Sequence, residues 1–229
     1  MKYLIIPIII GLTLLGACKK NSDSAVPDTH GNFMVVDALP NGVQYDIRLD
    51  TIAFASNVGY KTVTGYKSYR AQKYNLIITP AGQPGVILYN NGIFLRNNRY
   101  YTAFLGGDSL KNPLLIITED DLTPARGDSA KFRVIDLSQG FKPNRTPLGM
   151  DVLSGVGPII FKGLAFPSQT AFAPLVGDSA YAIRFKYVDS SLTLRYHPLP
   201  TQKGKVYTLV TAGYPLDSAR FNILTIQHN

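Results

Sequence analysis

The sequence predicts an all-β protein, a sandwich or barrel of short strands, on three observations. Tyr181, Ile183, Phe185 and Tyr187 alternate with small or charged residues, the period-2 pattern of a half-buried strand. Short apolar runs of this kind recur between clusters of the turn-forming residues Gly, Asn, Asp and Pro. No stretch after the N-terminal apolar run places apolar residues at helical spacing. These patterns are typical of β-sandwiches and barrels.

Residues 1–17 are predicted to form a signal peptide. A positive second residue is followed by an apolar run over residues 4–15, which is too short to span a bilayer. Gly16 and Ala17 then directly precede Cys18, the only cysteine in the chain. This order resembles the lipobox of bacterial lipoproteins, in which the cysteine is acylated and becomes the first residue after cleavage. We therefore expect lipidation of Cys18, for example by palmitate; an ordinary signal peptide cleaved after Ala17 is the alternative.

Residues 18–31 are expected to be the lipidated cysteine and a flexible tether, because they are polar and rich in small residues. Lys19 and Lys20 stand where Asp would signal retention in the inner membrane, so the outer membrane is expected, with its leaflet left open. No later apolar run approaches the roughly 20 residues of a membrane helix. The lipid on Cys18 is thus the expected membrane contact.

An internal repeat divides the rest of the chain into two similar halves. The matches keep their order along the sequence: Phe33–Ala38 with Phe132–Leu137, Val58–Tyr60 with Leu164–Phe166, Tyr66 with Phe172, Tyr101–Ala103 with Tyr207–Leu209, and Leu115–Ile117 with Leu224–Ile226. The offset grows early in the second half, so we expect an enlarged loop at residues 141–148. Because Tyr60 and Tyr66 match phenylalanines, we expect them to lie in a core.

Several short motifs also resemble one known family. They are Val36-Asp37, the Asn57–Tyr60 turn, the Tyr100–Thr102 strand and the Glu119–Pro124 connection. Their order is similar to that of the domain of unknown function 4397 family, over residues 32–227. The resemblance implies tandem Ig-like domains of the kind found in secreted bacterial proteins and lipoproteins, and no catalytic motif. It places a first Ig-like sandwich at 32–121, a linker at 122–129 and a second sandwich at 130–229.

Composition narrows the expected partners. The apolar content of 45% is that of a globular protein, and the formal net charge is +8. The positive charge favours anionic neighbours such as lipopolysaccharide or acidic glycans. Nucleic acid is not expected as a partner, because the basic residues are scattered and an exported protein meets little of it.

Catalytic and metal-binding signals are weak. Gly107–Leu110 spells the nucleophile motif of GDSL-type esterases, but no Asp-x-x-His follows to supply a base. Glu119, Asp120 and Asp121 are a weak calcium candidate, with a solvated linker as the alternative. The three histidines are too far apart in sequence to predict a zinc site. We therefore expect no enzyme, no metal and no small-molecule cofactor, with an esterase as a remote alternative.

Two groups of residues are candidates for binding or modification. Aromatic and basic residues interleave near residue 70, and a second basic group follows, which gives possible glycan or polyanion contacts at Lys67, Tyr69, Arg70, Lys73, Arg96 and Arg99. The alternative is a solvated strand face.

A tripeptide Asp-Ser/Thr-aliphatic resembles an O-glycosylation acceptor and occurs at Ser24, Thr51, Ser109, Ser129, Ser179 and Ser218. Turn chemistry enriches the same tripeptide. We expect Ser24 and Ser129 to be the most accessible, and Thr51 to be the least certain because the pattern also allows it to lie inside a strand.

The function expected from the sequence is that of a non-catalytic outer-membrane lipoprotein. Its sandwiches would present an interaction surface to an envelope protein or glycan. A purely structural envelope component is the alternative. An exposed aromatic patch would favour a glycan, and an unpaired apolar edge strand would favour a protein partner.

Overall fold

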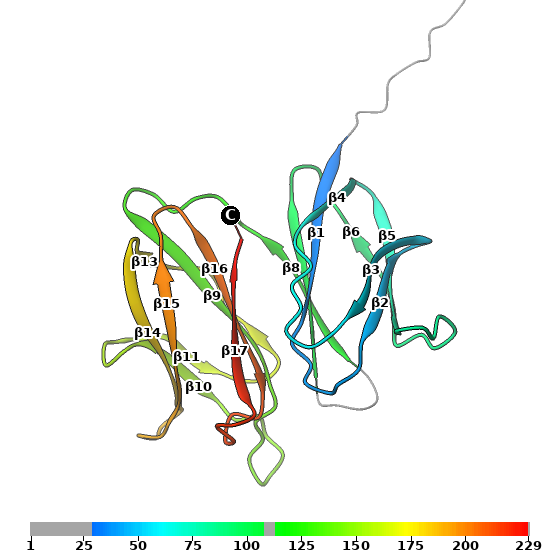
Figure 1. Ribbon diagram of the computed structural model, residues 1–229. Coiled ribbons are helices and arrows are strands. Elements are labelled where there is room, and N and C mark those ends of the chain that lie inside the picture. Colours follow the sequence, from blue (N-terminus) through cyan, green and yellow to red (C-terminus); the bar gives the residue numbers. More distant parts are fainter. Residues whose placement is uncertain (1–28, 108–112, 229) are drawn as a thin grey trace, which may run out of the picture.

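The computed structural model describes residues 29–107 and 113–228, and every regular element in these ranges is a β-strand (Figure 1). The predicted all-β class is thereby confirmed. The strands are β1 (His30–Asp37), β2 (Tyr45–Leu49), β3 (Ile52–Val58), β4 (Lys67–Arg70), β5 (Lys73–Pro80), β6 (Tyr89–Phe94), β7 (Tyr100–Gly106), β8 (Leu114–Asp120), β9 (Ser129–Ser138), β10 (Met150–Ser154), β11 (Ile159–Leu164), β12 (Ser168–Gln169), β13 (Ala173–Val176), β14 (Ser179–Tyr187), β15 (Thr193–Thr201), β16 (Val206–Gly213) and β17 (Phe221–Gln227).

The strands form two sandwiches with the same topology. In the first, the sheet β4-β1-β7-β8 faces the sheet β3-β2-β5-β6. In the second, the sheet β12-β9-β16-β17 faces the sheet β11-β10-β14-β15, and β13 also pairs with β9. Within these sheets β1 and β7 pair in parallel, as do β9 and β16, while the other pairings are antiparallel. The second sandwich therefore repeats the strand order of the first, with β13 in the place of β4 and the short β12 as an additional strand.

The strand register agrees with most of the sequence repeat. Phe33 lies opposite Tyr101 in the first sandwich, and Phe132 lies opposite Tyr207 in the second. The connection between β9 and β10, residues 139–149, is longer than the β1–β2 connection, as expected from the drift of the repeat.

One part of the predicted repeat is wrong by a single residue. Leu105 lies opposite Leu115, whereas Thr211, its counterpart, lies opposite Ile223. A shift of one residue exchanges the two faces of a strand. Accordingly, Leu115 packs on the core of its own sandwich, whereas Leu224 faces the other sandwich. The correct match of Leu115–Ile117 is to Ile223–Thr225.

Each sandwich has its own apolar core. The alternation seen in the sequence places Tyr45, Ile47 and Leu49 inside the first sandwich. Ile183 and Phe185 are likewise inside the second. These strands are half-buried, as their period-2 pattern predicts.

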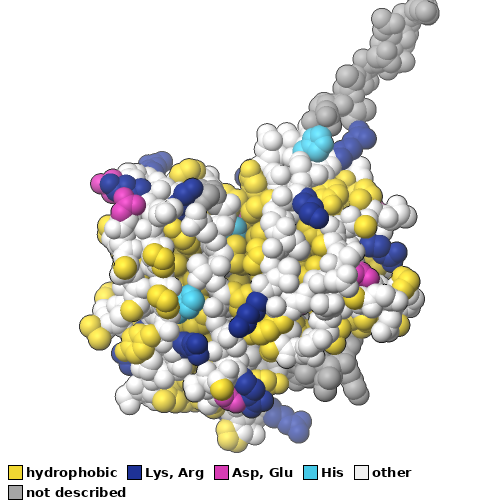
Figure 2. Space-filling model, in the orientation of Figure 1, with side chains coloured by type: hydrophobic (Ala, Val, Ile, Leu, Met, Phe, Trp, Pro, Cys, Tyr) yellow, Lys and Arg dark blue, Asp and Glu magenta, His cyan; other side chains and the backbone are white. Residues whose placement is uncertain are grey.

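A third apolar cluster joins the two sandwiches. It combines residues of β1 and β7 with residues of β9, β16 and β17: Met34, Val36, Ala38, Phe104, Ile135, Leu137, Val210, Ala212, Leu224 and Ile226. Strands β1, β7, β9 and β16 are therefore buried on both faces. Tyr60 and Tyr66, expected in a core, pack instead against this cluster between the sandwiches. Figure 2 shows apolar side chains along the line where the two halves meet.

Candidate functional site

A buried ion pair connects the sandwiches at one end of their interface. Asp120 is the last residue of β8, and Arg133 lies in β9. A guanidinium Nη2 of Arg133 donates to Asp120 Oδ1, and the two side chains are 5% and 0% exposed. The guanidinium also lies 4.8 Å from the ring centroid of Phe172. A pair this deeply buried is costly to break from one side, because the remaining charge has no water to solvate it.

The Asp120 carboxylate is saturated with hydrogen bonds. Its Oδ2 accepts from the hydroxyls of Tyr66 at 2.7 Å and Thr102 at 2.5 Å. Its Oδ1 accepts from Thr118 at 2.6 Å, in addition to Arg133. Since Thr102 and Thr118 are on neighbouring strands, the sheet itself positions these donors around the carboxylate.

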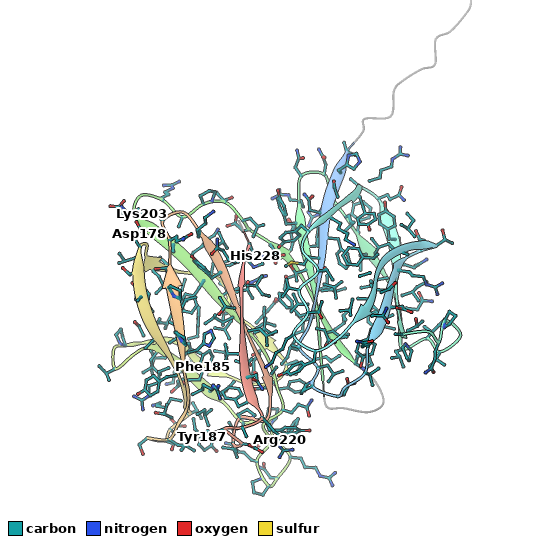
Figure 3. The ribbon with its side chains drawn as sticks, in the orientation of Figure 1. Asp178, Phe185, Tyr187, Lys203, Arg220 and His228 are labelled. Atoms are coloured by element: carbon teal, nitrogen blue, oxygen red, sulfur yellow. The ribbon has the colours of Figure 1, made fainter. Side chains whose placement is uncertain are left out.

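His228 continues the network on the second sandwich. Its Nδ1 lies 2.9 Å from the Tyr66 hydroxyl, and its Nε2 lies 2.7 Å from the Thr208 hydroxyl. Because Tyr66 gives its only proton to Asp120, we assign a proton to Nδ1 of His228 and the acceptor role to Nε2. Burial lowers the pKa of His228 to about 4, which keeps the ring neutral near pH 7. Figure 3 shows His228 between the two sandwiches.

The network lies on equivalent positions of the repeat. The corrected register places Asp120 at the position of His228, since Glu119 and Gln227 lie opposite the equivalent Tyr101 and Tyr207. Likewise, Met34 and Arg133 lie opposite the equivalent residues Thr102 and Thr208. The two copies thus meet through the same face and differ in charge at two places.

Glu119, Asp120 and Asp121, the calcium candidates, each face a different basic side chain. Glu119 pairs with Arg96 at 2.5 Å and with Arg99 at 3.5 Å. Asp121 accepts a hydrogen bond from Lys131 at 2.9 Å, and this bond lowers the pKa of Asp121 to about 2. Together with the pair of Asp120, each acid has its own basic partner. Among residues 29–107 and 113–228, no three His, Cys, Asp or Glu side chains gather into a metal-binding group.

Three hollows surround this junction. One of about 310 Å³ lies between the β6–β7 turn, residues 121–123 and His228. A second, of about 470 Å³, lies between β8 and residues 169–172 of the second sandwich. A third, of about 340 Å³, lies between β8 and β6. Strand β8 therefore borders hollows on both sides.

The residues expected to contact a glycan lie at the end of the first sandwich where β1 begins. Arg70 and Lys73 are exposed at the β4–β5 turn. Arg96 and Arg99 belong to the β6–β7 turn and are held by Glu119. The nitrogen of Lys67 instead covers the ring of Phe54 at 4.9 Å, and Tyr69 packs between the rings of Phe54 and Tyr74. The basic residues thus surround no exposed aromatic platform of their own.

The Asp-Ser/Thr tripeptides occupy turns and strand starts. Thr51 lies in an exposed turn after Asp50, whose φ is 53°, and not inside a strand. Ser218 is also exposed, beside an Asp217 carboxylate that caps its own turn. Ser129 and Ser179 are half-buried at the starts of β9 and β14, so Ser129 is less accessible than expected. Glycan attachment at these sites stays a prediction.

Three sequence candidates lie outside the described residues. They are Cys18, Ser24 and Ser109, the last within the esterase-like tripeptide. None of the described residues forms a helix long and apolar enough to cross a membrane.

Sequence reasoning missed most of the buried network. The one available signal was Arg133, a charge within the apolar run Phe132–Leu137. A charge in a strand buried on both faces requires a partner. Nothing in the sequence pointed to Tyr66, Thr208 or His228 as members of the same cluster.

Fold and junction define the class of this protein: an all-β chain of two repeated sandwiches packed through equivalent faces. The family model of the domain of unknown function (DUF4397) matches residues 31–143. This match confirms the family resemblance over the first sandwich, the connection and β9. It ends within the enlarged β9–β10 loop.

Two solved structures of other proteins are distantly similar. One is the family 26 carbohydrate-binding module CBMbc of Amy13K from Eubacterium rectale, in complex with maltoheptaose: 12% identity, 85% of this chain and 96% of that chain covered, TM-score 0.28. The other is a candidate cell adhesion protein from Bacteroides eggerthii DSM 20697: 11% identity, 89% and 97% covered, TM-score 0.27. At these TM-scores neither likeness bears on the function of this chain. Among curated proteins no match was found.

Proposed function

We propose that this chain is a non-catalytic, lipid-anchored protein of the cell envelope, in which two sandwiches form one rigid binding body. The observation that supports this role most directly is the junction. An apolar cluster and a buried ion pair hold the two sandwiches in a fixed orientation, and hollows lie on both sides of β8 next to this junction. A surface whose geometry is set before binding loses little conformational entropy when it binds.

The position of β1 supports a tethered arrangement. The chain enters the first sandwich at His30, only twelve residues after Cys18. An acylated Cys18 would therefore hold this end of the sandwich within roughly 40 Å of the bilayer, the reach of an extended chain of that length. We place the anchor in the outer membrane because lysines, and not Asp, follow the cysteine.

The anchor is tested by replacing Cys18 with serine. The variant should move from the membrane fraction to the soluble fraction, because a serine hydroxyl cannot take the place of the acylated thiol. Fractionation of host cells at high salt, followed by immunoblotting, measures this. The wild-type protein in the same preparation is the control. A variant that still sediments with membranes at high salt contradicts the lipid anchor.

The binding surface is tested by photo-crosslinking in living cells. A photoreactive amino acid at Phe94, beside the hollow between β6 and β8, should form an adduct with another envelope component. The same label at Leu216 in the β16–β17 loop is the matched control, because both side chains are 60% exposed. The expected result is an adduct at position 94 and none at 216.

The chemical nature of the adduct separates the two partner classes. A protease-sensitive adduct identifies a protein partner, and a glycosidase-sensitive one identifies a glycan. We favour the protein, because the structure exposes an unpaired apolar strand edge at β8. No adduct at either position in intact cells contradicts the binding role and favours the purely structural alternative.

A further inference from the structure

Strand β8 is an edge strand with an open side. It pairs with β7 on one side only, and among the described residues no other backbone hydrogen bond reaches it. Its sequence, Leu114–Asp120, holds four consecutive aliphatic residues and no proline. Long, apolar and regular edges of this kind are templates for pairing with another strand, and most proteins block them.

The direction of the free backbone groups follows from the β1–β7 pairing. The nitrogen of Asn32 donates to Arg99 O at 2.7 Å, and that of Ala38 donates to Leu105 O at 2.8 Å. The odd-numbered residues of β7 therefore turn their backbone groups to β1, and the even-numbered ones turn theirs to β8. Given the β7–β8 register, the backbone groups that point away from β7 are those of Leu115, Ile117 and Glu119.

This edge lies along two hollows. Ile117, Thr118 and Glu119 line both of them. On one side the opposite wall carries Ile93 and the exposed ring of Phe94. On the other side the opposite wall is formed by residues 169–172 of the second sandwich. A strand placed on the edge of β8 would project its side chains alternately into the two hollows.

In the second sandwich, side chains of the facing sheet reach across to the corresponding edge strand. This strand, β17, is the counterpart of β8, and the neighbouring β15 reaches across to it. His197 Nε2 lies 2.6 Å from the Thr225 hydroxyl, and Arg195 donates to Ser218 O at 2.9 Å. In the first sandwich, the turn after β6 contacts β8 through the ion pairs of Arg96 and Arg99 with Glu119.

We propose that the open edge of β8 binds an extended segment of a partner protein by strand addition. The segment fits by supplying the backbone hydrogen bonds that Leu115, Ile117 and Glu119 lack. It carries aliphatic side chains at alternate positions, because Ile93, Phe94 and Ile117 form an apolar wall. A glycan has no repeating backbone amide that would match this edge. The inference deepens the proposed binding role and rests on it.

The test uses the mature chain with Cys18→Ser, to keep it soluble, and a displayed library of nine-residue peptides. Ile117→Pro removes one outward N–H without removing a bond to β7. Thr225→Pro is the matched control at the equivalent position of β17. Phe94→Asp is a second variant, whose exposed side chain leaves the fold unaffected.

Peptides selected on the parent protein should show alternating aliphatic residues. They should bind at least tenfold more weakly to Ile117→Pro and Phe94→Asp, and unchanged to Thr225→Pro. Hydrogen exchange of the amides of Leu115, Ile117 and Glu119 should slow when peptide binds. Peptides that bind a folded Ile117→Pro variant as well as the parent, or no enrichment at all, overturn strand addition. Crosslinking at Phe94 together with such a failure leaves a binding surface of another kind.

Discussion

Replacing Arg133 by methionine should lower the free energy of unfolding by about 3–5 kcal/mol, the cost of removing one partner of a buried ion pair. Methionine is what the first sandwich carries at the equivalent position, Met34, so the apolar part of the packing is retained. The Asp120 carboxylate, which is 0% exposed, is left without a cation. Chemical denaturation at pH 7 measures the change.

Two further variants identify the cause of this loss. The double variant Arg133→Met, Asp120→Asn should recover much of the stability, because the uncompensated charge is gone. Arg220→Met breaks an exposed ion pair with Asp217 and should change stability by less than about 1 kcal/mol. If Arg133→Met costs no more than Arg220→Met, the buried pair does not fix the junction.

Replacing Asp37 by asparagine should stabilise the protein at neutral and alkaline pH, by about 2–4 kcal/mol. Burial raises the pKa of the Asp37 carboxyl to about 7. Its Oδ1 accepts from the nitrogen of Leu39, and its Oδ2 has no partner among the described residues. Because the folded state favours the protonated Asp37 carboxyl, its contribution to stability is complete below pH 3.8 and is lost as the pH rises through 7. Each pKa unit corresponds to about 1.4 kcal/mol. Asparagine keeps the acceptor and never ionises.

His228 has the opposite pH dependence, which sharpens the measurement. Its pKa is lowered from 6.5 to about 4, so its contribution is present above pH 6.5 and is lost as the pH falls through 4. In the wild-type protein the two groups offset each other between pH 4 and 7. The free energy of unfolding of Asp37→Asn should therefore rise with pH over this range, because only the contribution of His228 remains. Denaturation midpoints from pH 4 to 8 measure it, with the exposed Asp178→Asn as control. Parallel curves for wild type and Asp37→Asn contradict the prediction.

Local patterns predicted the strands well, because burial on one face leaves a period of two in the sequence. The same reasoning could not find the partner of a strand buried on both faces. Phe33–Ala38 is a continuous apolar run, and nothing in it says that its second face meets another sandwich. The predicted match to β17 was wrong by one residue because Ile223 and Leu224 are adjacent aliphatic residues, so the apolar pattern fits either register.

The junction was harder to predict for a related reason. Its polar members come from strands far apart in the chain, and Tyr66 lies 162 residues from His228. Such contacts depend on how the two sandwiches dock, which no local period encodes. The candidate site at β8 was foreseen only as a general criterion, an unpaired apolar edge, and its position had to come from the strand order.

The charge difference between the two equivalent faces decides which sandwiches can pair when several copies of the chain are close together. Two neighbouring chains carry the same apolar faces and, in principle, each first sandwich could dock on another first sandwich. In that arrangement Met34 would take the place of Arg133, and each Asp120 would be buried without a cation. Such a mispaired contact is costly. Asp120 and Arg133 therefore favour the docking of a first sandwich on a second sandwich over the docking of two first sandwiches on each other.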